Sequence, residues 1–342
     1  MGDEGRNYLT NADEFDLLNW RKDMITPREN MLRYFRGEDC EWTPSSLDQL
    51  CFRPACIPEN IARGMTMQQT PYKGEYGGHG FFGVEWVFDP NVSGSIEKVP
   101  LLADIIGWGD KVRFPNIDEI DWELCAKENE DYLKTDKMIY TTIYSSFFER
   151  LISFVGFENA AMALIDEDQR GSVKMLFDRL ADFYIELISR LRKHFGVELI
   201  EFHDDWGTQI STFFSVETHK EMIAPYLKRV VDSAHMKGVF VELHSCGKID
   251  RLIPNIISAG IDTWRGQAIV DKKRLVDEFS GVFKFGVEIK PEMSVSDSEA
   301  IALVEEALQF WHGKNVWLFI ARTFTPAQKG LIYQYIRERK VI

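Results

Sequence analysis

The sequence predicts an α/β protein, a (β/α)8 barrel of the TIM type, and three observations support this fold class. First, apolar runs typical of strands alternate with segments of helical periodicity from residue 137 onward. Second, the run VFVEL at 239–243 fits a parallel strand that is covered on both faces. Third, no predicted strand is followed by a glycine-rich phosphate-binding motif, which counts against an open doubly wound sheet.

Strands and helices alternate without a break in residues 137–342. The predicted strands lie at 137–143, 197–202, 239–243, 261–264, 282–289 and 316–320. Four predicted helices lie at 172–195, 217–236, 271–279 and 296–313. Two others are predicted to end at Gly156 and at Gly260, and the last helix is predicted to begin at Thr325. Capping boxes mark the last two helices. One or two strands from the first third would complete eight.

Residues 1–136 are less regular, although we expect 1–342 to form a single domain. Thr26, Pro27 and Gly37 delimit a predicted helix. Only 84–88 is typical of a strand, within a stretch at 73–90 that is rich in glycine and aromatic residues. Such a stretch is typical either of a lid or pocket wall, near Trp86 and His79, or of an irregular surface segment.

The composition excludes several classes of protein. With 342 residues, 45% of them hydrophobic, the chain can bury a sizeable core. A net charge of −14 disfavours nucleic acid and anionic membranes as partners. No apolar run approaches the roughly 20 residues of a membrane span, and the polar, acidic start is unlike a signal peptide. The five scattered cysteines, including Cys51 and Cys56 as structural thiols, suit a reducing cytoplasm.

Polar residues collect after the predicted strands, which is where the active site of a barrel lies. The candidates are His203, Asp204, Asp205, His244, Cys246, Arg265, Gln267, Glu288, Lys290, Arg322 and Thr323. Histidines, a thiol, adjacent carboxylates and an arginine in five successive strand ends indicate a site.

These residue types suit metal or acid–base chemistry, and structural interpretations stand beside each. Adjacent Asp204 and Asp205 can raise one another's pKa and hold a proton, or one can cap a helix while the other is solvated. His244 and Cys246 can both bind zinc, or they are a packed histidine and a buried thiol. Glu242 alternates with His244 along its strand, so it is a ligand, a partner that orients a ligand, or a rim residue.

With HDDWGTQ (203–209) and HSCGKIDRLIPNIISAGID (244–262) in view, the chain resembles the uroporphyrinogen decarboxylase-like superfamily. This superfamily includes the decarboxylase and the cobamide-dependent methyltransferases. The resemblance is clearest at 197–290, and FFGVEWVFDP at 81–90 is similar to the methyltransferase-like branch. It implies a (β/α)8 barrel, in agreement with the alternation of elements.

The resemblance favours the methyltransferase branch, because the decarboxylase's M-R-Q-A-G-R motif for substrate carboxylates does not occur here. In that branch His-x-Cys supplies two zinc ligands, matched by His244 and Cys246. The third family ligand, a cysteine after the last strand, is missing from FIARTFTPAQ. Glu288, Glu242 or His203 would replace it, or no metal binds. The missing cysteine favours a donor-side or tetrahydrofolate-side enzyme over a thiol methylase.

The resemblance therefore implies an enzyme that moves a methyl group between a small molecule and the cobalt of a corrinoid protein docked over the barrel mouth. The small molecule would be a methoxylated aromatic (O-demethylation), a methylamine or betaine, or tetrahydrofolate. The expected residues are His244 and Cys246 for zinc, Asp204, Asp205 and Glu288 for catalysis, and His203, Gln267, Arg322, Trp86 and His79 for substrate binding.

Two alternatives to the methyltransferase stay open from the sequence. One is a decarboxylase of a carboxylated porphyrinogen, in which Asp204 or Asp205 protonates the substrate. The other is a non-catalytic module that binds a corrinoid or tetrapyrrole. Neither the methyl donor nor the oligomeric state follows from the sequence.

Overall fold

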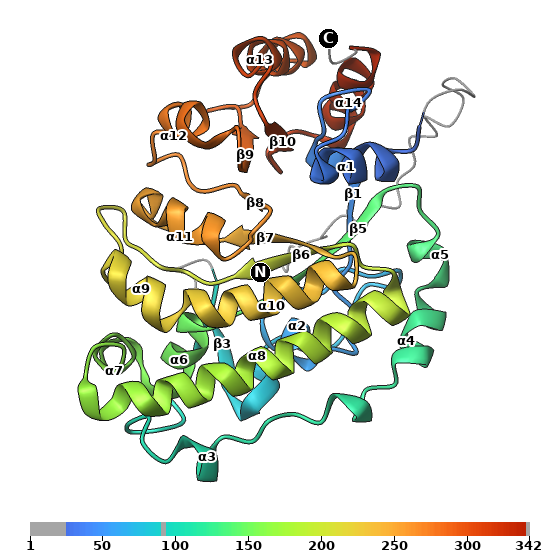
Figure 1. The fold of residues 1–342 in the computed structure, drawn as a ribbon. Helices are drawn as coiled ribbons and strands as arrows, with labels where there is room; N and C mark the ends of the chain where they lie inside the picture. The colour runs from blue at the N-terminus through green and yellow to red at the C-terminus, as the bar shows by residue number, and fades with distance from the viewer. Residues whose placement is uncertain (1–24, 90–93, 340–342) are drawn as a thin grey trace, which may run out of the picture.

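The computed structural model describes residues 25–89 and 94–339, so the acidic start of the chain lies outside the described residues. Its centre is a parallel sheet of seven strands in the order β1-β5-β6-β7-β8-β9-β10 (Figure 1). The strands are β1 (Gln49–Cys51), β5 (Met138–Ile143), β6 (Leu199–His203), β7 (Phe240–His244), β8 (Thr263–Trp264), β9 (Lys284–Ile289) and β10 (Val316–Ile320).

The sheet returns on itself, as a barrel requires. An isolated parallel bridge joins Ser45 to Leu318 of β10, and the Leu318 N–H donates to the Pro44 carbonyl at 2.8 Å. The same segment continues through a short turn of helix, η1 (Ser46–Asp48), into β1, which pairs with β5. The predicted barrel fold is confirmed, but the prediction of eight strands is wrong for the described residues. Segment 45–51 closes the sheet, because it pairs with β5 through β1 and with β10 through Ser45.

Helices follow every strand from β5 onward, which confirms the predicted alternation. They are α6 (Phe148–Val155), α7 (Phe157–Ala163), α8 (Glu167–Phe195), α9 (Val216–Met222), α10 (Ala224–Met236), η4 (Asp250–Leu252), α11 (Ile253–Ser258), α12 (Lys272–Phe279), α13 (Asp297–Phe310) and α14 (Pro326–Glu338). The long α8 packs along α10 outside the sheet (Figure 1). The single helix predicted at 217–236 is two helices, because Pro225 lacks the N–H that would continue α9.

Helix α1 (Pro27–Arg36) closes the amino-terminal end of the barrel. Its Met31 and Phe35 belong to a separate apolar cluster with Met138 and Leu199, which begin strands β5 and β6. Phe35 also stacks on Phe240, the first residue of β7, with ring centroids 4.8 Å apart. Apolar side chains therefore fill this end of the barrel.

The first third adds a small antiparallel sheet beside the barrel, β2 (Gly78–His79), β3 (Glu85–Asp89) and β4 (Gly94–Glu97). The strand predicted at 84–88 is therefore present but lies outside the barrel. Short helices accompany this sheet: α2 (Pro58–Ala62), α3 (Trp108–Lys111), η2 (Phe81–Gly83), η3 (Ile117–Glu119), α4 (Trp122–Glu128) and α5 (Glu130–Leu133).

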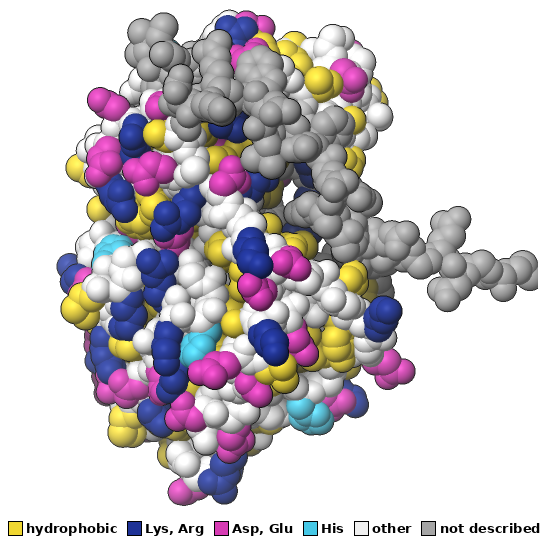
Figure 2. Space-filling model, turned by 90° about the vertical axis from the view of Figure 1, so that its right-hand side faces the viewer, with side chains coloured by type: hydrophobic (Ala, Val, Ile, Leu, Met, Phe, Trp, Pro, Cys, Tyr) yellow, Lys and Arg dark blue, Asp and Glu magenta, His cyan; other side chains and the backbone are white. Residues whose placement is uncertain are grey.

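The surface carries charges of both signs. On the face shown in Figure 2, lysine and arginine side chains are interspersed with acidic ones and form no continuous basic stripe. Among the helices that the structure describes, none is both long enough and apolar enough to cross a membrane.

Candidate active site at the barrel mouth

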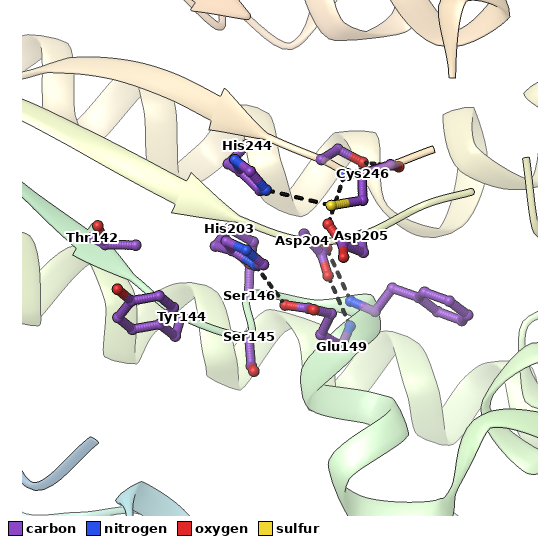
Figure 3. A network of polar contacts seen from close by, with 12 residues as sticks. Thr142, Tyr144, Ser145, Ser146, Glu149, His203, Asp204, Asp205, His244 and Cys246 are labelled. Carbon is purple, nitrogen blue, oxygen red and sulfur yellow. Dashed lines mark hydrogen bonds and ion pairs between the residues drawn. The ribbon is translucent and has the colours of Figure 1, made fainter. Parts of the chain in front are cut away.

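Two histidines lie side by side at the carboxyl end of the sheet. His203 ends β6 and His244 ends β7, and the two residues are partners in the register of the parallel pair. Their rings stack with centroids 4.3 Å apart and planes within 13° of parallel (Figure 3). The sequence placed each at a strand end, and strand pairing brings them together.

A thiol and a carboxylate complete a compact group around these rings, which we call the mouth cluster: His203, Asp205, His244 and Cys246. Nε2 of His244 lies 3.6 Å from Sγ of Cys246, and the Cys246 N–H donates to Oδ1 of Asp205 at 2.6 Å. Donor atoms of His203, Asp205 and His244 all lie within 4.8 Å of one another. Nitrogen and oxygen donors of these three residues thus converge, and the sulfur of Cys246 lies beside His244.

Glu149 orients His203 from the first turn of α6. Its Oε2 lies 3.0 Å from Nδ1 of His203, and both side chains are mostly buried (Figure 3). Glu149 is not among the site residues predicted from the sequence, where it belongs only to a helix. Glu149 lies six residues after Ile143, the last residue of β5. This position could have indicated a role in the site, because the active site of a barrel lies at the carboxyl ends of its strands.

Opposite pKa shifts distinguish the two stacked imidazoles. Burial opposes protonation of His203, but attraction to Glu149, then Asp205 and Glu201, outweighs it and raises the pKa to about 9. Burial, followed by repulsion from His203, lowers the pKa of His244 to about 4. At neutral pH His244 is therefore neutral, the form that binds metals. Burial and the nearby Asp205 raise the pKa of the Cys246 thiol to about 12.

Asp204 and Asp205 have different environments. Asp204 is fully buried, and its carboxylate accepts backbone N–H groups of Phe147, Phe148 and Glu149 at 3.2, 3.0 and 2.7 Å. It thus caps the start of α6, the alternative that the sequence left open. Burial and then Glu149 raise the pKa of Asp204 to about 7, against these donors. Asp205 is the carboxylate that reaches the mouth cluster.

Of the remaining polar candidates, Gln267 contacts the loop of the mouth cluster, whereas Glu288 and Arg322 do not contact the cluster. Oε1 of Gln267 accepts the Gly247 N–H at 2.9 Å and so fixes the loop that carries Cys246. Gly247 has φ +92°, and a Cβ there would meet the Gly207 backbone at 2.3 Å, so this close approach requires glycine. Glu288 and Arg322 are exposed and, within the described residues, form no hydrogen bond or ion pair with the mouth cluster.

The predicted residues of the first third are divided between core and surface. His79 is exposed on β2. Trp86 is only 2% exposed, and the Arg63 guanidinium lies 4.0 Å from its ring centroid. The indole therefore supports Arg63 and does not present an open aromatic wall.

Residues 148–285 match the family model described as uroporphyrinogen decarboxylase (URO-D). This segment is therefore similar to the uroporphyrinogen decarboxylase family. It contains Glu149 and the whole mouth cluster, so the resemblance inferred from the sequence is confirmed for the region that carries the site.

Among solved structures, a methyltransferase from Methanosarcina mazei shares the fold with a TM-score of 0.65 at 14% identity. The match covers 92% of this chain and 99% of that chain. A putative vitamin-B12 independent methionine synthase from Listeria monocytogenes matches at 15% identity over 61% of this chain and 66% of its own, with a TM-score of 0.36. No curated protein matches the sequence. The likeness to the Methanosarcina mazei methyltransferase shows a shared fold.

Proposed function

We propose that this protein is a methyltransferase that moves a methyl group between a small molecule and the cobalt of a corrinoid carried by a partner protein. The mouth cluster carries this proposal, because its two imidazoles, thiol and carboxylate converge at the carboxyl end of the barrel. The fold shared with a methyltransferase along almost the whole chain supports it. The partner would dock over the mouth, where the corrin can reach the cluster.

The mouth cluster fits a zinc ion in the type and spacing of its donors. A nitrogen and a sulfur bound to one tetrahedral zinc at about 2.0 and 2.3 Å lie about 3.5 Å apart. His244 and Cys246 are separated by 3.6 Å. Donor atoms of His203 and Asp205 lie within 4.8 Å of a donor atom of His244, and His203 would supply the third ligand in place of the family's missing cysteine. A catalytic zinc uses three protein ligands and leaves one position for substrate.

Zinc bound there would act as a Lewis acid on the atom that carries the methyl group. Glu149 would hold His203 in one orientation by accepting from its Nδ1–H, as carboxylates do for zinc-binding histidines. With His203 as the third ligand, Asp205 would stay free of the metal. Burial, followed by repulsion from Glu149, raises the pKa of Asp205, so this side chain can hold the proton that a departing ether oxygen requires. The cobalt of the partner's cobamide would supply the other end of the transfer.

The decarboxylase alternative has less support in this geometry. Asp204 accepts three backbone N–H groups and is fully buried, so it is not available to a substrate in this conformation. A decarboxylase would then depend on Asp205 alone for protonation.

The test combines zinc analysis with methyl transfer to a corrinoid probe. We expect near-stoichiometric zinc in the purified protein and its loss from the His244→Ala, Cys246→Ala double variant. Glu149→Gln should keep the fold but weaken zinc binding by about 10- to 100-fold, because His203 loses its orienting carboxylate. Free cob(I)alamin should be methylated, seen as loss of its absorbance, with methoxybenzoate, betaine or methyltetrahydrofolate as donor.

Three results would contradict the proposal. Absence of zinc from the wild-type protein would contradict the proposed zinc site. Decarboxylation of uroporphyrinogen without methyl transfer would establish the decarboxylase. Tight corrin binding without turnover of any of the three donors would establish a non-catalytic module.

A further inference from the structure

Two cysteines from distant parts of the chain meet at a groove that is separate from the mouth cluster. Cys56 lies in the turn before α2, and Cys125 lies on α4, 69 positions later in the chain. Both are free thiols, and both line a groove of about 590 Å³. None of the described residues that line this groove belongs to the mouth cluster, so the thiol pair is distinct from the candidate active site.

The surroundings of Cys125 favour its thiolate form. The Cys56 thiol donates a hydrogen bond to Sγ of Cys125, and this bond is the largest influence that lowers the pKa of Cys125. Sγ of Cys125 also accepts from the Cys56 backbone N–H and from Nδ2 of Asn129 at 3.9 Å. All five cysteines lie among the described residues, and Cys125 is the one whose pKa is lowered. Since the thiolate is the nucleophile, Cys125 is the reactive member of the pair.

Cys56 is positioned to react with an oxidised Cys125. The hydrogen bond to Cys125 and then burial raise the pKa of Cys56, so this thiol keeps its proton beside the neighbouring sulfur. The other three cysteines have different surroundings: Cys40 contacts two backbone carbonyls at 3.6 and 3.8 Å, Cys51 is buried, and Cys246 belongs to the mouth cluster. A reactive thiol beside a second thiol is the arrangement of cysteines that oxidise reversibly.

The charges of the groove favour an uncharged oxidant. Glu119, Asp121 and Glu128 line it, and Arg113 is the one cation among the described lining residues. This excess of negative charge repels anionic oxidants such as glutathione disulfide. Hydrogen peroxide is neutral and small enough to reach Cys125 from the groove.

We propose that Cys125 and Cys56 are a site of reversible oxidation by hydrogen peroxide, at which the two thiols become a disulfide. The Cys125 sulfur attacks one peroxide oxygen, the O–O bond breaks, and hydroxide leaves a sulfenic acid on Cys125. The Cys56 sulfur then attacks the sulfenic sulfur, the S–O bond breaks, and water leaves as the disulfide forms and Cys56 gives up its proton. The two thiols lose two electrons, and the peroxide is reduced to two waters. The bond would tie α4 to the turn before α2, and a dithiol reductant would reverse it.

The test treats the reduced full chain with hydrogen peroxide and maps its peptides by mass spectrometry after the remaining thiols are blocked. We expect a peptide in which Cys56 is linked to Cys125, and the free thiols of the denatured protein should fall from five to three. Dithiothreitol should restore all five. In Cys56→Ser the sulfenic acid cannot be resolved, so dimedone should label Cys125. Cys125→Ser should slow thiol oxidation at least tenfold.

Cys40→Ser is the matched control, since it removes a half-buried cysteine that lies outside the groove. It should form the linked peptide at the wild-type rate, and so should the His244→Ala, Cys246→Ala variant, which separates the pair from the proposed zinc site. Circular dichroism checks the folding of each variant, and the peptide map of the wild type needs no substitution. Absence of the linked peptide, faster oxidation of Cys40 or Cys246 than of Cys125, or an unchanged rate in Cys125→Ser would overturn the proposal.

Discussion

His219 and His203 show how neighbours decide the charge of a buried imidazole in this protein. His219 is fully buried against Trp206, its Nδ1 accepts from the Asn255 side chain at 3.2 Å, and burial lowers its pKa to about 3. His203 is also largely buried, yet the carboxylate of Glu149 raises its pKa to about 9. A facing carboxylate therefore reverses the effect of burial.

His219 gives a prediction for the dependence of stability on pH. In the folded protein it stays neutral down to about pH 3, whereas in the unfolded chain it takes up a proton near pH 6.5. Its contribution to stability is present above pH 6.5 and is lost as pH falls towards 3. Between pH 6.5 and 4.5 the loss should be about 2 kcal/mol.

Urea unfolding at these two pH values measures the effect. His219→Gln, which does not titrate, should show a free energy of unfolding that falls by about 2 kcal/mol less than that of the wild type over this range. An equal fall in both proteins would show that His219 is not the group responsible.

Some residues of the candidate site could be predicted from the sequence, and others could not. His203, Asp205, His244 and Cys246 stand directly at strand ends, so their positions were predictable. Glu149 reaches the site from the first turn of a helix. Its approach depends on how that helix packs against the sheet, which the local sequence does not encode.

At the scale of elements, one buried ion pair joins α6 of the barrel to α2 and the small sheet. Nη2 of Arg150 contacts Oε1 of Glu59 at 2.8 Å, and Oε2 of Glu59 accepts the Phe81 N–H at 2.7 Å. Both charged side chains are almost completely buried. The pair thus connects segments that are 91 residues apart in the chain.

Glu59→Gln should destabilise the protein by about 3–5 kcal/mol, because it leaves the buried Arg150 cation without a counter-charge. The midpoint of urea unfolding measures this loss. Glu130→Gln is the control, since its ion pair with Lys134 is exposed to solvent and should contribute little to stability. If both variants lose the same small amount, the buried pair does not hold the two parts together.

At the scale of the whole molecule, Asp48 connects the first segment of the barrel to its last helix. It is fully buried and accepts from Nε1 of Trp42 at 3.0 Å, the Ser45 N–H at 2.8 Å and the Tyr333 hydroxyl at 2.9 Å. Tyr333 belongs to α14, so one carboxylate joins the segment before β1 to the last helix. This is the same region in which Ser45 pairs with β10.

Asp48→Ala should therefore cost more stability than the loss of any one of these bonds. We expect about 3 kcal/mol or more, since several buried donors lose their acceptor at once. Tyr333→Phe removes a single hydrogen bond and should cost about 1 kcal/mol. Thermal and urea unfolding of the two variants measure the difference, and equal losses would show that Asp48 does not act as a shared anchor.

The sequence by itself determined the α/β class, the strands and helices from 137 onward and the strand-end residues of the site. These features follow from local periodicity, capping residues and the rule that barrel sites lie at the carboxyl ends of strands. Tertiary structure alone decided that segment 45–51 closes the sheet, that Asp204 caps α6 while Asp205 reaches the mouth, and that Glu149 joins it. Each of these depends on contacts between residues distant in the chain, and such contacts leave no periodic pattern in the sequence.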